Sequence, residues 1–168
     1  MPSPIALTAE LIEAFSATFL SPMYDTPVRI PDFHRECWQL YCTEARQASI
    51  AAPRGHAKST ALTHAYGLAT VLFRAQKYVV VVGSTEELAI GHLGNIAKEL
   101  RDNDDLKLEF GIKCFITDSK TDIIVKCTDG YEFRLIAKGA GQRMRGLLWN
   151  GIRPGLILCD DLEDDEDE

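Results

Sequence analysis

The stretch Ala51-Ala-Pro-Arg-Gly-His-Ala-Lys-Ser-Thr60 decides the fold, because it approximates a loop that binds phosphate groups. In the usual pattern, G-x-x-x-x-G-K-[ST], backbone N–H groups wrap the phosphates, the lysine reaches their outer oxygens, and the hydroxyl binds Mg²⁺. When the chain is aligned on Lys58-Ser59, the two glycine positions hold Ala52 and Ala57. Alanine can serve there only if the backbone needs no positive φ and has room to approach the ligand.

The segments on either side of the loop predict a strand before it and a helix after it. Ser49–Ala52 is a short apolar run, and Thr60–Arg74 has apolar residues at helical spacing. This order would place the phosphates at a helix N-terminus, where unpaired N–H groups and the helix dipole favour an anion. Lys58 would then neutralise the charge of the β- and γ-phosphates, and Ser59 would bind Mg²⁺.

The remaining elements predict an α/β fold. Further helices are expected over Thr8–Leu20, from Asp32 onward, and over Glu86–Leu100, with Thr8 and Ser84 as caps of the first and last. Strands are expected over Lys77–Gly83, Asp122–Cys127, Tyr131–Ala137 and Gly155–Cys159. The turn Thr128-Asp-Gly130 indicates a hairpin. Alternating strands and helices predict a three-layer domain with a mostly parallel central sheet and a hairpin insertion.

The last expected strand ends in two acids, Asp160 and Asp161. An acid at the C-terminal end of a buried strand can hold Mg²⁺, while a neighbouring acid positions the attacking water. Alternatively, Asp160 only opens a solvated acidic tail. The buried type of strand before it favours the metal-binding role, and residues 164–168 are left as tail or linker.

Composition and charge limit the classes of protein that fit. The 168 residues suit about one domain, and no apolar run is long enough for a membrane span. No secretory signal is visible, and the five irregularly spaced cysteines are typical of reduced thiols. The net charge is -7, but eight of the 25 acidic residues lie in the last nine positions. The charge of the chain is therefore unevenly distributed, and its sum does not exclude an anionic partner.

A basic region precedes the acidic strand. Between Arg134 and Cys159 there are five basic residues and no acid. Within this region, Gly139-Ala-Gly-Gln-Arg-Met-Arg-Gly146 predicts a flexible glycine-rich loop. Its arginines could stabilise charge on a γ-phosphate in the transition state, or they could contact DNA phosphates.

Taken together, these motifs resemble the N-terminal ATPase domain of large terminases, the DNA-packaging motors of tailed bacteriophages. The resemblance runs from about residue 28 to residue 163, and it rests on Pro53–Thr60, Val79–Thr85 with Leu88-Ala89, Ala140–Gly146 and Arg153–Glu163. It implies a P-loop NTPase of the additional-strand class, incomplete after the Walker B strand. Residues 1–31 would then form an N-terminal helix and connector, 32–163 the ATPase domain, and 164–168 an acidic tail or the start of further sequence.

The resemblance also implies cofactors and partners. The cofactors would be ATP and Mg²⁺, and hydrolysis would drive double-stranded DNA into a procapsid. The partners would be this DNA, the portal protein, the small terminase subunit and further copies of the chain in a pentameric ring, with no membrane. The location would be the host cytoplasm and, transiently, the portal vertex of the procapsid.

The family motif assigns nucleotide contacts to the loop and to one upstream helix. The loop contacts would come from Pro53, Arg54, Gly55, His56, Ala57, Lys58, Ser59 and Thr60. Arg54 matches an arginine expected to contact the γ-phosphate or couple it to motion. His34 falls where the family places a glutamine that recognises adenine, and a plain surface histidine is an open alternative.

The same motif assigns the catalytic roles. Asp160 would bind Mg²⁺ together with Ser59. Asp161, or Glu163 in its place, would position the attacking water. Arg145 is the first choice for an arginine finger that acts across a subunit boundary, and Arg143 is the second.

Two other functions stay open at this point. One is a helicase-like DNA translocase of the same superfamily, which downstream helicase motifs would favour. The other is a nucleotide-binding or interaction module without hydrolysis. The nuclease part of a large terminase is absent from these residues, so we expect no DNA cleavage, and weak or no ATP hydrolysis by this chain alone.

Overall fold

The computed structural model describes residues 6–23, 29–51 and 57–162. The chain divides into two units, Pro2–Ala75 and Gln76–Glu168. The first unit is helical and the second is built on a mixed sheet. The boundary between them lies inside the range 32–163 that the sequence assigns to one domain.

The described residues of the first unit form three longer helical stretches, all predicted from the sequence. They are α1 (Ala9–Phe15) with a π-helical end (Ser16–Leu20), α2 (Asp32–Tyr41), and a π-helical stretch (Thr60–Ala65) that leads into α3 (Tyr66–Leu72). Thr8 caps α1 as expected, because its side chain accepts a hydrogen bond from Leu11 N at 3.2 Å. A short 3₁₀ turn, Ser21–Met23, follows α1.

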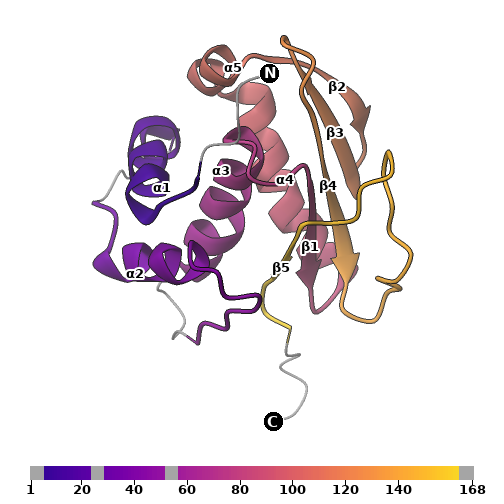
Figure 1. Ribbon diagram of the computed structural model, residues 1–168, viewed down its shortest axis with the longest axis horizontal. Coiled ribbons are helices and arrows are strands. Elements are labelled where there is room, and N and C mark those ends of the chain that lie inside the picture. Colours follow the sequence, from indigo (N-terminus) through magenta and orange to yellow (C-terminus); the bar gives the residue numbers. More distant parts are fainter. Residues whose placement is uncertain (1–5, 24–28, 52–56, 163–168) are drawn as a thin grey trace. The chain divides into compact units, whose positions relative to one another are not determined.

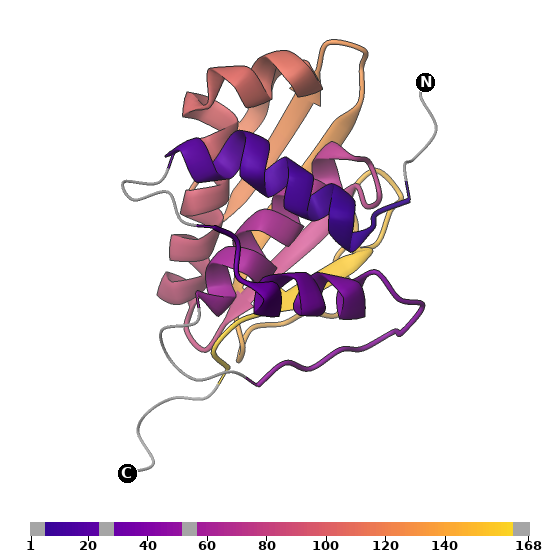
Figure 2. The same ribbon diagram turned by 90° about the vertical axis from the view of Figure 1, so that its left-hand side faces the viewer.

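The helices of this unit pack against one another (Figure 2), and aromatic side chains lie between them. Trp38 of α2 is buried, and its indole N–H donates to the carbonyl of Ala61 at 2.9 Å. Phe15 of α1 meets Phe73, just after α3, edge to face at 5.8 Å. The helix that follows the phosphate-loop motif is therefore packed against both upstream helices of its unit.

The second unit is a five-stranded sheet in the order β2-β3-β4-β1-β5 (Figure 1). Its strands are β1 (Tyr78–Gly83), β2 (Ile112–Asp118), β3 (Asp122–Cys127), β4 (Glu132–Gly139) and β5 (Leu156–Cys159). β1 pairs in parallel with β4 and with β5. β2, β3 and β4 form an antiparallel meander. The α/β class, the predicted hairpin and the parallel central pairs are thus confirmed.

The core of this unit lies on both faces of β1, all of whose residues are buried. Helix α4 (Glu86–Asp102) lies along one face of the sheet (Figure 1). On the other face, Tyr78, Val80, Val82 and Ile136 form an apolar cluster. Met144, Leu147 and Trp149, from the segment between β4 and β5, pack against this cluster. The continuous valine run is therefore explained by burial on both faces.

The start of α4 differs by one residue from the prediction. Thr85, not Ser84, is the N-cap, and its side chain accepts a hydrogen bond from Leu88 N at 3.3 Å. Thr85 has the extended backbone that an N-cap requires. Ser84 instead uses its backbone N–H to bond the carbonyl of Asp161 at 3.2 Å.

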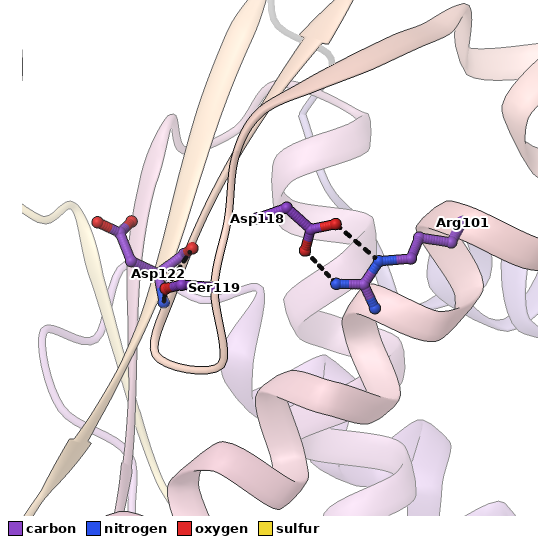
Figure 3. A network of polar contacts seen from close by, with 4 residues as sticks. All are labelled: Arg101, Asp118, Ser119 and Asp122. Carbon is purple, nitrogen blue, oxygen red and sulfur yellow. Dashed lines mark hydrogen bonds and ion pairs between the residues drawn. The ribbon is translucent and has the colours of Figure 1, made fainter.

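Two elements were not predicted, helix α5 (Asp104–Phe110) and strand β2. Asn103 caps α5 by accepting a hydrogen bond from Leu106 N at 3.1 Å, and Gly111 ends the helix with a φ of 64°. At the far end of β2, the Asp118 carboxylate pairs with both the Nε and the terminal nitrogen of Arg101 (Figure 3). This pair fastens the end of α4 to the end of β2.

Replacing Gly83 by alanine is expected to lower the free energy of unfolding by about 1–3 kcal/mol. A Cβ atom there would lie 2.9 Å from Ala89 N and 3.0 Å from Thr85 O, which are backbone atoms that cannot move aside cheaply. Urea unfolding of the variant measures the change. Gly91→Ala is the matched control, because nothing lies within 4 Å of its added Cβ, and it should gain about 0.5–1 kcal/mol. Equal effects at the two positions would contradict this packing.

Candidate nucleotide site

The expected strand before the phosphate-loop motif is not formed in its described part. Residues 49–51 are irregular, and Ser49 and Ala51 are exposed. A short apolar run becomes a strand only when a neighbour supplies a ladder, and no ladder in the described parts of the chain includes these residues. Ala52, Pro53, Arg54, Gly55 and His56 lie outside the described residues, so their predicted roles stay predictions.

The end of the motif opens a helix, as the sequence predicts. Ala57 accepts the first helical hydrogen bond, from Ala61 N at 3.1 Å, and Lys58 and Ser59 form the first turn. Thr60 begins the π-helical stretch. The N–H groups of a first helical turn suit an anion, and here the turn also carries an ammonium and a hydroxyl.

Ala57 corrects the expectation that alanine occupies its glycine position without a positive φ. Its φ is +50°, in the left-handed region. For a residue with a Cβ this conformation costs roughly 1–2 kcal/mol. Strain of this kind gathers at ligand-binding turns, where the surroundings hold it in place. The glycine of the usual pattern is therefore replaced in sequence, while the backbone conformation that favours glycine is kept.

His34 lies on α2, in the same unit as Lys58. Its side chain is largely covered, with 7% exposed, and its ring centroid lies 6.0 Å from that of Trp38. It is therefore not the plain surface histidine of the alternative interpretation. A buried imidazole offers little surface on which an adenine ring could stack. The contact between His34 and adenine stays a prediction.

In the second unit, the carboxyl ends of three parallel strands meet. Asp160 N, just after β5, donates to Val82 O of β1 at 2.9 Å. Ala140 N, just after β4, donates to Gly83 O at the end of β1, also at 2.9 Å. With the bond from Ser84 to Asp161, these contacts gather Ser84, Ala140 and the two acids at one edge of the sheet. Ligands of open α/β sheets bind at this edge.

Asp160 is the most buried acid of this edge, with only 4% exposed. Its Oδ2 lies 3.7 Å from Nε2 of His92, which comes from the second turn of α4. Asp161 is exposed and has a φ of +43°, so the chain turns sharply as it leaves the strand. Glu163 lies outside the described residues. The sequence predicted the place of Asp160 but gave no sign of His92.

Strand β5 is less buried than its apolar sequence predicts. It is an edge strand among the described residues, and Ile157 is 51% exposed while Leu158 is buried. Its side chains alternate between a more covered and an exposed face, and only one of its long edges is paired in the described sheet. Asp160 is nonetheless covered, since it follows the strand toward β1 and α4.

The basic segment between β4 and β5 is anchored, whereas the sequence predicted a flexible loop. Met144 packs on the apolar cluster, and the flanking Arg143 and Arg145 are exposed. Because Met144 faces the cluster, the two arginines on either side of it face outward. Arg134 does not add to the exposed basic surface, because it forms two hydrogen bonds with Asp122, at 2.9 and 2.7 Å.

The donors present fit a Mg²⁺ ion that is shared with a phosphate ligand. Within the described ranges, no group of three or more His, Cys, Asp or Glu is placed to hold a metal. Mg²⁺ in nucleotide sites is bound by one or two protein oxygens, by substrate phosphates and by water. The carboxylate of Asp160 and the hydroxyl of Ser59 are donors of this kind. Ser59 belongs to the first unit and Asp160 to the second.

No helix among the described residues is long and apolar enough to cross a bilayer. None of the five cysteines forms a disulfide. Comparisons of the chain with protein-family models, with curated proteins and with solved structures found no match.

Proposed function

We propose that the protein is a Mg²⁺-dependent P-loop ATPase of the additional-strand class, the motor domain of a viral large terminase. The observation that supports it most is Asp160, a buried carboxylate at the carboxyl end of a strand in a parallel pair. The helix that begins at Lys58-Ser59 after a left-handed residue adds a second, independent support. The proposal requires that both groups bind the same nucleotide.

Each residue then has a defined task. The ammonium of Lys58 holds the outer phosphate oxygens, and Arg54 adds positive charge from inside the loop. Ser59 and Asp160 are the side chains that would hold Mg²⁺, which when bound neutralises charge on the β- and γ-phosphates. Asp161, or Glu163 in its place, orients the attacking water and accepts its proton.

The anchored segment between β4 and β5 supplies the arginine finger in this scheme. Arg145 would reach the γ-phosphate of a neighbouring subunit, with Arg143 as the second choice. Their exposure beside Met144 supports this role, because the segment that carries them is held against the apolar cluster.

The resemblance supplies the biological setting of the proposal. The motor would assemble as a pentameric ring, engage double-stranded DNA, the portal protein and the small terminase subunit, and act in the host cytoplasm at the procapsid. The exposed arginines support a phosphate-bearing partner, because Arg pairs well with phosphate oxygens.

Replacing Lys58 by alanine is expected to weaken binding of a fluorescent ATP analogue about 10- to 100-fold. Losing a charge-assisted contact costs roughly 1.5–3 kcal/mol, which corresponds to that range. Fluorescence titration in Mg²⁺ measures the dissociation constant. Lys98→Ala is the matched control, because Lys98 is exposed on α4. If Lys58→Ala bound the analogue as tightly as the control, the loop assignment would be wrong.

A further inference from the structure

Two glycines fix the position of α4 on the sheet. A Cβ at Gly139 would lie 3.0 Å from Glu86 N, and one at Gly83 would lie 2.9 Å from Ala89 N. The first turn of α4 therefore rests directly on the ends of β4 and β1, without a side chain between. Because the helix is rigid, this close approach also sets the place of His92, one turn further on.

The side chains of His92 and Asp160 lie close to each other near this end of the sheet. The distance from Nε2 to Oδ2 is 3.7 Å, and the two side chains are 19% and 3% exposed. The backbone of Asp160 is held by its hydrogen bond to Val82 O. The imidazole thus faces a buried carboxylate whose backbone is hydrogen-bonded to β1.

We infer that His92 is a positioning residue that holds the Asp160 carboxylate in the orientation that accepts a divalent cation. The inference rests on the proposed function, which makes Asp160 a Mg²⁺ ligand. Carboxylates that bind metals are oriented by neighbouring polar groups. Losing such a neighbour typically lowers the affinity for the metal 10- to 100-fold. His92 would act on the cation through Asp160 and would not touch the nucleotide.

Mn²⁺ in place of Mg²⁺ tests this role. The readout is the Mn²⁺ concentration that gives half-maximal binding of a fluorescent ATP analogue, for wild type, His92→Ala, His92→Gln and Asn95→Ala. We expect His92→Ala to raise this concentration about 10- to 100-fold. His92→Gln should recover part of the loss, because its amide can donate to the carboxylate. Asn95→Ala, exposed on the same helix, should match wild type.

Three outcomes would overturn the inference. One is an unchanged Mn²⁺ requirement in His92→Ala, while Asp160→Asn raises it. Another is a histidine nitrogen coupled directly to Mn²⁺ in electron spin-echo spectra of the wild type and lost in His92→Ala, since His92 would then be a ligand. The third is binding of the analogue that does not depend on the Mn²⁺ concentration in any variant, Asp160→Asn included. Only this third outcome would also overturn the proposed metal role of Asp160. Urea unfolding of each variant separates loss of the fold from loss of the site.

Discussion

Replacing Asp160 by asparagine is expected to raise the Mg²⁺ concentration needed for half-maximal ATP-analogue binding about 100-fold. An asparagine keeps the size of the side chain but removes the charge that attracts the cation. The removed group is a buried carboxylate. Losing a charge-assisted contact costs up to about 3 kcal/mol, which corresponds to roughly 100-fold. Fluorescence titrations at stepped Mg²⁺ concentrations give the value.

Asp105→Asn provides the control for this experiment. It makes the same chemical change at an exposed position on α5. We expect its Mg²⁺ requirement to equal that of wild type. A requirement that stays within about twofold in Asp160→Asn would mean that this acid is structural, and the metal assignment would have to move elsewhere.

The stability of the protein is expected to fall by about 3 kcal/mol between pH 7 and pH 4 through one histidine, His64. Burial lowers the pKa of His64 from 6.5 to about 4, because the charged imidazolium is poorly solvated in the fold. In the unfolded chain the same group keeps its ordinary pKa. Between these two values the unfolded state binds the proton and the folded state does not, so stability is lost as the pH falls through this window.

The comparison with His64→Gln isolates this contribution, since glutamine does not titrate. Urea unfolding of both proteins at pH 7, 5 and 4 gives two pH profiles, and other titrating groups cancel in their difference. The wild-type profile should fall more steeply below pH 6.5. Parallel profiles would show that His64 takes up its proton equally in the folded and unfolded states.

Local sequence signals predicted most of the second unit. The valine run of β1 has a composition suited to two buried faces, and Thr128-Asp-Gly130 joins β3 and β4 as a hairpin turn. These signals need no knowledge of distant contacts, because each is contained in fewer than ten residues. For the same reason the strand before Asp160 was found within one residue.

The missed features depend on tertiary structure. β2 has two register shifts against β3, which break the alternation that reveals a half-buried strand. At residues 49–51 the error is the reverse: the sequence predicted a strand, but this apolar run is irregular in the structure. His92 looked like any polar residue of an amphipathic helix. Its proximity to Asp160 arises only because α4 packs on the sheet beside the end of β5.

In the phosphate-loop motif, the residue type at position 57 did not predict the backbone conformation there. Its alanines predicted a backbone without positive φ, but Ala57 adopts the left-handed conformation that glycine would have taken. Sequence patterns record which side chains are tolerated, while the backbone conformation depends on the turn that the fold needs. A departure from glycine is therefore a weak argument against a nucleotide-binding turn.

Hydrogen exchange of the protein with and without Mg²⁺·ATP tests the central claim most directly. The claim is that Lys58-Ser59 and Asp160 bind one nucleotide, although they lie in different units. Bound Mg²⁺·ATP should slow exchange both in the helix that begins at Lys58 and at residues 160–162, and should leave α5 and β2 unchanged. Protection of only one of the two segments, or of neither, would contradict the account.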